Sequence, residues 1–598
     1  MVITPVPCDG KPQDKSDIDG TANGSGPTAA NTALERLVHA CYKIRGKPAE
    51  QGLHVATKLI LVARSGYLCR KDILELRAGY SELVEAVIPL STHDGYLPLA
   101  EQGETCLLTL LASSPGALLA KETPPTTKRL DQDLKARLSF DWILSTKPCT
   151  QSGDGRGASN ALGISVIVLD HPDHWLQGEE YSHLRDEFIG IDMTIDEGLE
   201  SRIIEAVKGK GIDGIVTFAD HFLDATIRVA EKLGLPTDPV PAHLQSLYKY
   251  TTRKRASPDI QALHLEKAGQ LDNISMSSML ETLRYPLIVK PCRGGGSRGV
   301  SKVNNLASLR QAIHEVEEAG YTKQGILVET YANGPEVDAN LMLWKDEILF
   351  FELSDEFPAL ADSENATISD NFDEDIEVDL QEVDLVRSSV HRTLLKLGFH
   401  SGVFHVEARV QNSTMRYKTT NGVVDLEHIN SGLTAEEPCQ QPKVFLIEVN
   451  PRPPGPQCVY STTFTYGVDY FGLQWLRALD DGERFAALCH PFTPDVRYCS
   501  ADVNIPIHRK NIHIPRGYCD EMLRRLPEIA PYVFKTECFT PGKTVSPIGN
   551  TGFIAYFLVY SRASRRHLLE MSDHIKKVSR NYLDGVVGSP CASAERGN

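Results

Sequence analysis

The stretch YPLIVKPCRGGGSRGVSKV, residues 285–303, decides how the centre of this chain is interpreted. Gly294, Gly296 and Gly299 form a G-x-G-x-x-G pattern after an apolar run that ends in Lys290. A dinucleotide-binding fingerprint requires a helix directly after the glycines, and a P-loop requires Gly-Lys-Ser/Thr at its end. The sequence has neither, because the residues after the last glycine have the pattern of a second strand. The stretch therefore predicts a glycine-rich β-hairpin.

The groups around this loop indicate what it can bind. Its backbone N–H groups and Arg298 can close over phosphate oxygens, and Lys290 on the adjacent strand adds a fixed positive charge. A turn that simply requires glycines accounts for the loop equally well. The residues downstream are therefore needed to decide between a nucleotide site and a plain turn.

The composition of the chain narrows the partners it can have. With 598 residues, 41% of them hydrophobic and 24% charged, it has the composition of a globular protein with room for several domains. Its formal net charge of -17 repels polyanions, so we expect no nucleic-acid partner and no membrane partner. The thirteen cysteines include no C-x-x-C pair, and the N-terminus has no signal-peptide pattern. We therefore expect a cytoplasmic protein with reduced thiols.

The pattern of apolar runs divides the chain into five segments of a multidomain protein that combines α/β and α+β parts. Strands alternate with helices in the third segment, which predicts a parallel sheet that includes DGIVTFAD (213–220), and antiparallel strands predominate after it. The segments are a disordered tail at 1–32, an extension of unknown role at 33–158, an α/β domain at 159–245, the hairpin-containing domain at 246–484, and a C-terminal α+β cap at 485–598.

Two strands downstream carry carboxylates among apolar residues. In FHVEARV (404–410) the side chains of His405, Glu407 and Arg409 share one face, because residues two apart on a strand point the same way. Unpaired carboxylates are costly to bury in such a strand, so Glu407 requires a cation. We leave His405 outside the metal shell, since a histidine at such a position is more often satisfied by hydrogen bonds.

The strand FLIEVN (445–450) carries the second set. Glu448 and Asn450 share one face, and Ile447 is expected on the opposite face. If this strand is the neighbour of the first one, opposed side chains lie about 5 Å apart. One or two Mg²⁺ ions can then bridge Glu407, Glu448 and the amide oxygen of Asn450.

Five motifs together resemble the successive signatures of the ATP-grasp superfamily, over about residues 160–480. The resemblance implies an ATP-grasp fold preceded by a Rossmann-like domain. Within the superfamily the chain is most similar to the carboxylate-amine ligases, in particular the amino-acid ligases and carnosine synthase. The finer placement depends on the IEVNPRPPG ending and on FFELSDEFPAL (350–360). The motifs are YKYTTR (248–253), IVKPCRGGGSRGV (288–300), VETYANGPEVDANL (328–341), FHVEARV (404–410) and IEVNPRPPG (447–455).

The resemblance also implies which residues form the site. Lys249 and Lys290 would contact the phosphates, Glu329 would be the hinge acid next to the adenine edge, and Glu336 would accept from the ribose hydroxyls. Arg452 would steady the transferred phosphoryl group and the tetrahedral intermediate, with Lys290 as the second catalytic residue. The full ATP set is Lys249, Lys290, Gly294, Gly295, Gly296, Ser297, Arg298, Glu329, Thr330, Tyr331, Ala332 and Glu336, and the metal set is Glu407, Glu448 and Asn450, holding two Mg²⁺ ions with Mn²⁺ as a substitute.

The implied reaction is ATP-dependent formation of an amide bond between a small-molecule carboxylate, activated as an acyl phosphate, and a small-molecule amine. A bicarbonate-activating or carbamoyl-phosphate-type enzyme and a non-catalytic ATP-binding regulator are the alternatives, and a homodimer is left open. The chain departs from the family in a long insertion, residues 411–442, between the two metal strands. Its segment DLEHIN is a decoy, because Glu427 and Asn430 are three residues apart and cannot share a strand face. The acidic stretch 352–384 is expected to be a solvated loop.

Overall fold

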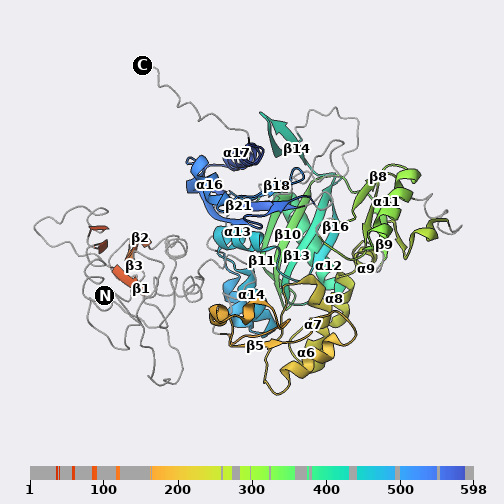
Figure 1. Cartoon of the computed structure of the whole chain (residues 1–598), viewed down its shortest axis with the longest axis horizontal. Helices are drawn as coiled ribbons and strands as arrows, with labels where there is room; N and C mark the ends of the chain where they lie inside the picture. The colour runs from red at the N-terminus through yellow and green to blue at the C-terminus, as the bar shows by residue number, and fades with distance from the viewer. Residues whose placement is uncertain are drawn as a thin grey trace, which may run out of the picture. The chain divides into compact units, whose positions relative to one another are not determined.

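The computed structural model of the chain describes helices and strands from most of its length (Figure 1). The predicted tail at 1–32, most of the extension at 33–158, most of the acidic stretch, and Gly296, Ser297 and Asn430 lie outside the described residues. The described residues are 36–37, 39–40, 57–60, 84–90, 116–120, 162, 164–257, 260–272, 283–295, 298–321, 325–356, 373–375, 380–429, 441–491, 499–547 and 552–585. They divide into two compact units, 1–208 with 466–476 and 481–495, and 209–465 with 477–480 and 496–598.

The first unit contains two small sheets. One is antiparallel, with the strand order β1-β3-β2, and Ile88, Ala117 and Leu119 are buried in it. The other is a parallel pair that precedes helix α6, as expected from the alternation of strands and helices. The bounds are β1 Thr57–Ile60, β2 Val84–Pro89, β3 Gly116–Ala120, β4 Ile167–Asp170, β5 Glu187–Gly190 and α6 Leu199–Val207.

The predicted strand at 213–220 is wrong. No strand is assigned there, and helix α7 (Asp220–Leu233) already begins at the last residue of the segment. The physical reason is visible at Gly214, where an added Cβ would collide with the carbonyl group of Ala478. The segment therefore packs against the end of a helix at this point instead of pairing with a strand. The Rossmann-like character of this part of the chain stays a prediction.

The glycine stretch folds as the sequence predicts. Strands β7 and β8 are antiparallel and form the hairpin, in a four-stranded sheet with the order β6-β9-β7-β8. Helix α11 packs on this sheet, and its Asn305 N-cap accepts a hydrogen bond from the backbone N–H of Ser308. The bounds are β6 Ala262–Leu265, β7 Leu287–Pro291, β8 Ser301–Val303, β9 Ile326–Thr330 and α11 Leu306–Glu318.

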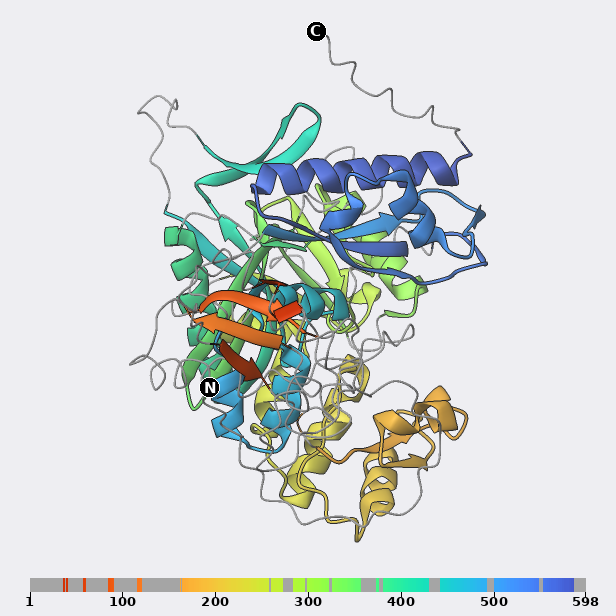
Figure 2. The same cartoon turned by 90° about the vertical axis from the view of Figure 1, so that its left-hand side faces the viewer.

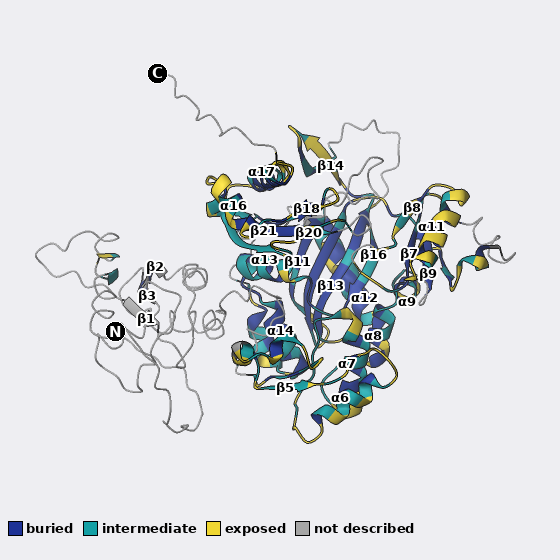
Figure 3. Ribbon diagram, viewed as in Figure 1, coloured by how far each residue is buried: buried dark blue, intermediate teal, exposed yellow. Residues whose placement is uncertain are grey.

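A second, eight-stranded antiparallel sheet occupies the centre of the second unit, with the order β16-β13-β10-β11-β12-β17-β21-β19. Its central strands are buried along most of their length (Figure 3). Three strands from the predicted C-terminal cap, β17, β19 and β21, continue this same sheet. The bounds are β10 Glu336–Trp344, β11 Glu347–Glu356, β12 Asp373–Asp375, β13 Gly402–Gln411, β16 Lys443–Asn450, β17 Cys499–Pro506, β19 Val533–Cys538 and β21 Phe553–Ser561.

Helices cover the sheet in two groups. Helix α12 and its neighbours α8 and α9 pack against the strands from β10 to β16, with Val386, Val390 and Leu394 in the core. Helices α16 and α17 pack against β17 and β21, and α17 runs across these strands in Figure 2. Among the described residues no helix is both long and apolar enough to cross a bilayer. The bounds are α8 Val240–Ser246, α9 Lys249–Ala256, α12 Leu380–Leu397, α13 Pro456–Tyr466, α14 Tyr470–Ala478, α15 Gly482–Leu488, α16 Tyr518–Arg525 and α17 Arg565–Leu583.

The insertion between the two carboxylate-bearing strands β13 and β16 forms a hairpin of its own, β14 (Met415–Thr420) and β15 (Val423–His428). Its turn residues Asn421 and Gly422 have φ values of 54° and 78°, which is the Asn-Gly signature of a tight hairpin. Arg565 at the start of α17 binds Asp425 of the hairpin at 2.8 Å and also binds both carboxylate oxygens of Asp355 on β11. The inserted hairpin is therefore bonded to a helix that is anchored on the large sheet.

Candidate ATP site

The two carboxylate strands are neighbours, which confirms the prediction made from their patterns. Strand β13 pairs with β16 so that Glu407 lies opposite Glu448 and His405 lies opposite Asn450. The register shifts after this pair, because Ala408 lies opposite Leu446 and leaves Ile447 as an extra residue. As a result Ile447 lines the same pocket as Glu448, and its expected position on the opposite face is wrong.

A pocket of about 250 Å³ collects most of the residues predicted for ATP. Its walls come from the small sheet with its glycine loop and from strands β10, β13 and β16. Asn450 and Arg452 are not among its lining residues, and Gly296 and Ser297 lie outside the part of the chain that the structure describes. The predicted residues in the lining are Lys249, Lys290, Gly294, Gly295, Arg298, Glu329, Thr330, Tyr331, Ala332, Glu336, Glu407 and Glu448.

Sequence reasoning missed part of this lining. Ile288 and Arg409 could have been found, because they lie two residues from Lys290 and Glu407 on the same strands. Phe445 and Ile447 were hidden by the register shift, and Glu356 by its position at the end of β11. The apolar members give the pocket flat or branched surfaces suited to a purine ring.

Glu329 fixes Lys290 in place. Its buried carboxylate binds the Lys290 ammonium at 2.9 Å and the Nε of Arg253 at 2.6 Å. Burial alone would raise the pKa of Glu329, but the charges of Lys290 and Arg253 outweigh it and lower the pKa to about 2. Glu329 therefore remains ionised, and it holds the lysine head against the pocket. No role was predicted for Arg253.

Lys249 connects the glycine loop to the carboxylate pair. Its ammonium donates to the Gly294 carbonyl at 2.6 Å and to Glu448 Oε1 at 2.8 Å. One lysine thus contacts both the loop that would cover a nucleotide and a strand that would hold a metal. A divalent cation would compete with this lysine for Glu448, and a phosphate would replace one of the two acceptors of the lysine.

Glu407 gives a test of whether a cation fits. Burial raises the pKa of Glu407 to about 8, with further contributions from the negative charges of Glu448 and Glu336, and Lys249 and Lys290 offset only part of the shift. Opposed carboxylates with uncompensated charge are the oxygen donors that Mg²⁺ prefers. The residues present therefore fit a divalent cation. In the described residues no group of three His, Cys, Asp or Glu side chains has a metal-binding arrangement, so an amide or phosphate oxygen must complete this shell.

Glu336, predicted to accept from ribose hydroxyls, is oriented by Arg409. The two residues lie opposite each other on β10 and β13, with Arg409 Nη2 at 2.6 Å and Nε at 2.9 Å from Glu336 Oε2. Arg409 also donates to the Tyr331 hydroxyl at 3.0 Å and to the Ala332 carbonyl at 3.3 Å. It therefore ties the predicted adenine-facing segment to the predicted ribose acceptor.

His405 belongs to a buried chain of hydrogen bonds. The amide nitrogen of Asn340 donates to Glu352 Oε1 at 3.1 Å, so its Oδ1 faces His405 Nδ1 at 2.9 Å and must accept from it. Burial, together with the positive charge of Arg452, lowers the pKa of His405 to about 3, so the ring is neutral. Its Nε2 is then an acceptor, 3.7 Å from Glu407 Oε1 and 3.8 Å from Asp338 Oδ2. The neutral ring therefore presents one acceptor within 4 Å of two carboxyl groups.

Arg452 is bound by a residue that the sequence did not single out. Its Nε contacts Asp220 Oδ1, and its Nη2 donates to Asp220 Oδ2 at 2.9 Å. Asp220 lies in the first turn of α7 and is more than half exposed, at 52% of its side chain. The arginine therefore has a bidentate partner that sets its direction, and its remaining N–H groups can meet a ligand phosphate or carboxylate.

Comparison with known proteins agrees with this geometry. Residues 157–237 match the ATP-grasp N-terminal domain, and residues 256–353 match the D-ala D-ala ligase C-terminus. The ATP-grasp enzyme fsqD of Aspergillus fumigatus is 32% identical over 581 residues, which cover 89% of this chain and 99% of that protein. A D-alanine–D-alanine ligase of Acetivibrio thermocellus is 32% identical over 114 residues, 19% of this chain and 24% of that protein.

Among solved structures, an L-amino acid ligase from Bacillus licheniformis superposes with a TM-score of 0.53 at 16% identity, covering 71% of this chain and 93% of that one. At this identity the likeness concerns the fold, which is the mixed α/β ATP-grasp architecture. The fsqD relative meets the chain over 89% of its length, far more than the partial matches do. The chain therefore belongs to the ATP-grasp family of enzymes and is an ATP-grasp ligase.

Proposed function

We propose that this enzyme uses ATP to join a carboxylate to an amine through an acyl phosphate. The observation that carries the proposal is the opposition of Glu407 and Glu448 in a pocket that also contains Lys249 and Lys290. Two carboxylates can hold a divalent cation and two lysines can neutralise phosphates, and a triphosphate with its metal requires both.

In the first step, a substrate carboxylate oxygen attacks the γ-phosphorus of ATP, and ADP departs. Lys249 and Lys290 neutralise the phosphate charge from fixed positions, since each is held by a carboxylate of the protein. Gly294, Gly295 and Arg298 supply loop backbone and charge over the nucleotide. Glu407, Glu448 and Asn450 would hold Mg²⁺ or Mn²⁺, which when bound neutralises the phosphate oxygens.

In the second step, the amine attacks the carbonyl carbon of the acyl phosphate, phosphate leaves, and an amide remains. Arg452, held in direction by Asp220, stabilises the developing negative charge with the N–H groups that Asp220 does not use. The neutral His405, whose Nε2 lies within 4 Å of Asp338 and Glu407, offers an acceptor to the amine. The balance is one acid, one amine and one ATP consumed for one amide, one ADP and one phosphate formed.

The substrate class is best supported as amino acids or acids of specialised metabolism. A relative over part of the chain is named a D-alanine–D-alanine ligase, which supports an amino acid on at least one side of the bond. Asp338 is buried opposite Glu407 in the sheet, and an acidic residue at this position suits an ammonium group.

An ADP-release assay with pooled amino acids, followed by mass spectrometry for new amides, tests the proposal. We expect ADP release that requires an acid and an amine together, with an amide product of matching mass. ADP release that depends on bicarbonate and yields no amide would indicate a carboxylase-type enzyme instead. ATP binding without ADP release under any condition would indicate a regulator.

A further inference from the structure

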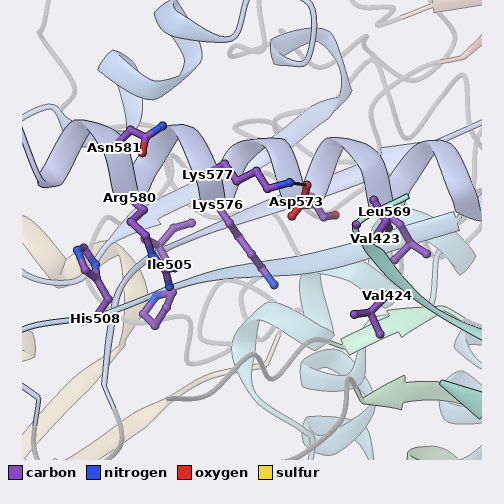
Figure 4. A pocket seen from close by; sticks show the side chains of 13 residues that line it. Val423, Val424, Ile505, His508, Leu569, Asp573, Lys576, Lys577, Arg580 and Asn581 are labelled. Carbon is purple, nitrogen blue, oxygen red and sulfur yellow. Dashed lines mark ion pairs between the residues drawn. The ribbon is translucent and has the colours of Figure 1, made fainter. Parts of the chain in front are cut away.

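A second cavity lies outside the catalytic pocket. It has a volume of about 360 Å³ and shares no lining residue with the ATP site. Figure 4 shows its position between helix α17, the end of β17 and the inserted hairpin. Val423, Val424, Ile505 and Leu569 form apolar walls. Nothing in the proposed reaction uses this space.

The polar part of the lining is positively charged. Lys576 and Arg580 lie one helical turn apart on α17, and the Lys576 side chain extends from the helix toward the strands in Figure 4. The lining includes one acidic residue, Asp573, which binds Lys577 at 2.5 Å. Among the described residues Arg580 has no carboxylate partner. Lys576 and Arg580 both bring a positive charge to this lining.

Ion pairs and hydrogen bonds fix both ends of the cavity. At one end the α17 residues Arg565 and Arg566 bind the hairpin, through Asp425 at 2.8 Å and through the Thr420 carbonyl at 3.0 Å. At the other end Asp584 accepts from His508 at 2.7 Å, which ties the loop after β17 to the end of the same helix. The walls are thus bonded to one element, and a ligand would find the cavity already formed.

The charges and the apolar walls together select a ligand. Cations in the last turns of a helix also interact favourably with its dipole, which explains charge there but not an apolar cavity beneath it. In a chain with a net charge of -17, a cationic hollow concentrates anions against the overall field. We infer that this cavity binds an amphiphilic anion, with a phosphate or carboxylate head group at Lys576 and Arg580 and an apolar body against Val424, Ile505 and Leu569.

Isothermal titration calorimetry on the full chain tests the inference directly and needs no turnover. The chain is first saturated with Mg²⁺ and a non-hydrolysable ATP analogue, so that the catalytic pocket is filled. The probes are octyl phosphate, octanoate, inorganic phosphate and octyltrimethylammonium. We expect octyl phosphate or octanoate to bind more tightly than inorganic phosphate. Octyltrimethylammonium, the octyl cation, should not bind. The tighter of octyl phosphate and octanoate identifies the head group.

Variants locate the site. Lys576→Gln with Arg580→Gln should weaken binding of the octyl anion at least about tenfold, the usual worth of a charge-assisted hydrogen bond. The control Arg524→Gln with Lys543→Gln removes two exposed cations outside the cavity and should leave binding unchanged. Lys576→Arg with Arg580→Lys keeps the charges and should retain binding. Equal binding of the octyl cation, no binding of either octyl anion, or unchanged binding in the Gln pair would overturn the inference.

Discussion

Arg452 and Asp220 lie 232 residues apart in the chain, yet the guanidinium of one binds both carboxylate oxygens of the other. The pair joins Arg452, two residues after the end of strand β16, to the first turn of α7. A bidentate contact of this kind sets the direction of the arginine before any substrate arrives. Asp220 is thereby a positioning residue for the proposed chemistry.

Removal of either partner should lower turnover, by different amounts. Arg452→Ala should reduce kcat by about 10²- to 10³-fold, the usual cost of losing one donor to a developing oxyanion. Asp220→Ala should cost roughly tenfold, because the arginine remains but is no longer directed. The KM for ATP should stay unchanged in both. In the double variant the two losses should not add, since both act through one guanidinium. Additive losses would show that Asp220 does not act through Arg452.

Loss of one opposed carboxylate should stop ADP formation. Glu448→Ala removes the carboxylate that lies opposite Glu407, so metal-dependent ATP binding should fall. The unfolding temperature should stay close to that of the parent chain. Glu427→Gln is the matched control, because Glu427 lies on the inserted hairpin and pairs with Lys418 at 3.0 Å on the surface. Full turnover of Glu448→Ala at ordinary Mg²⁺ would refute the metal assignment.

Glu329 should make the stability of the protein depend on acidic pH. Its pKa is about 2 in the folded chain against 4.5 in the unfolded one, so the folded state favours the ionised form. This contribution is present above pH 4.5 and is lost as the pH falls from 4.5 toward 2. Glu329→Gln leaves two buried cations without a carboxylate and should cost about 3–5 kcal/mol at pH 7. Urea unfolding at several pH values should show that acid lowers the unfolding free energy less in the variant than in the parent. Glu315→Gln, at an exposed position, should change neither the unfolding free energy at pH 7 nor its loss in acid.

The glycine loop offers two neighbouring positions with opposite tolerance. Gly294 has a φ of 127°, which L-residues rarely adopt, whereas Gly295 has no such requirement, and an added Cβ meets no atom within 4 Å at either position. Gly294→Ala should therefore cost roughly 1–2 kcal/mol through backbone strain alone. Gly295→Ala should leave the unfolding free energy nearly unchanged. Equal losses at both positions would show that the loop conformation is not what the alanine disturbs.

The patterns that depend on strict alternation could be predicted from the sequence. The hairpin at 285–303 and the pairing of Glu407 with Glu448 follow from strand periodicity and glycine placement, and both are present. The side of the sheet on which Ile447 lies could not be predicted. One extra residue in β16 reverses the side to which the preceding residues of the strand point.

Ion pairs between residues far apart in the chain could not be predicted from local sequence patterns. Nothing in the sequence around Asp220 indicates Arg452, and the strand predicted at 213–220 failed because its surroundings, not its apolar residues, decide its conformation. Arg253 was quoted within a motif, yet its partner Glu329 lies 76 residues away. Ion pairs of this kind are set by the tertiary fold.

The contacts of Arg565 have a consequence for comparing and recombining relatives. This one side chain bridges Asp355 of the sheet and Asp425 of the hairpin, three positions that no sequence neighbourhood connects. A homologue without the hairpin has no need of an aspartate at the second position, but still has a buried aspartate at the first to neutralise. Covariation between positions 355 and 565 should therefore outlast the gain or loss of the hairpin, and a chimera that receives the hairpin should find a partner for Asp425 only where the recipient keeps an arginine at position 565.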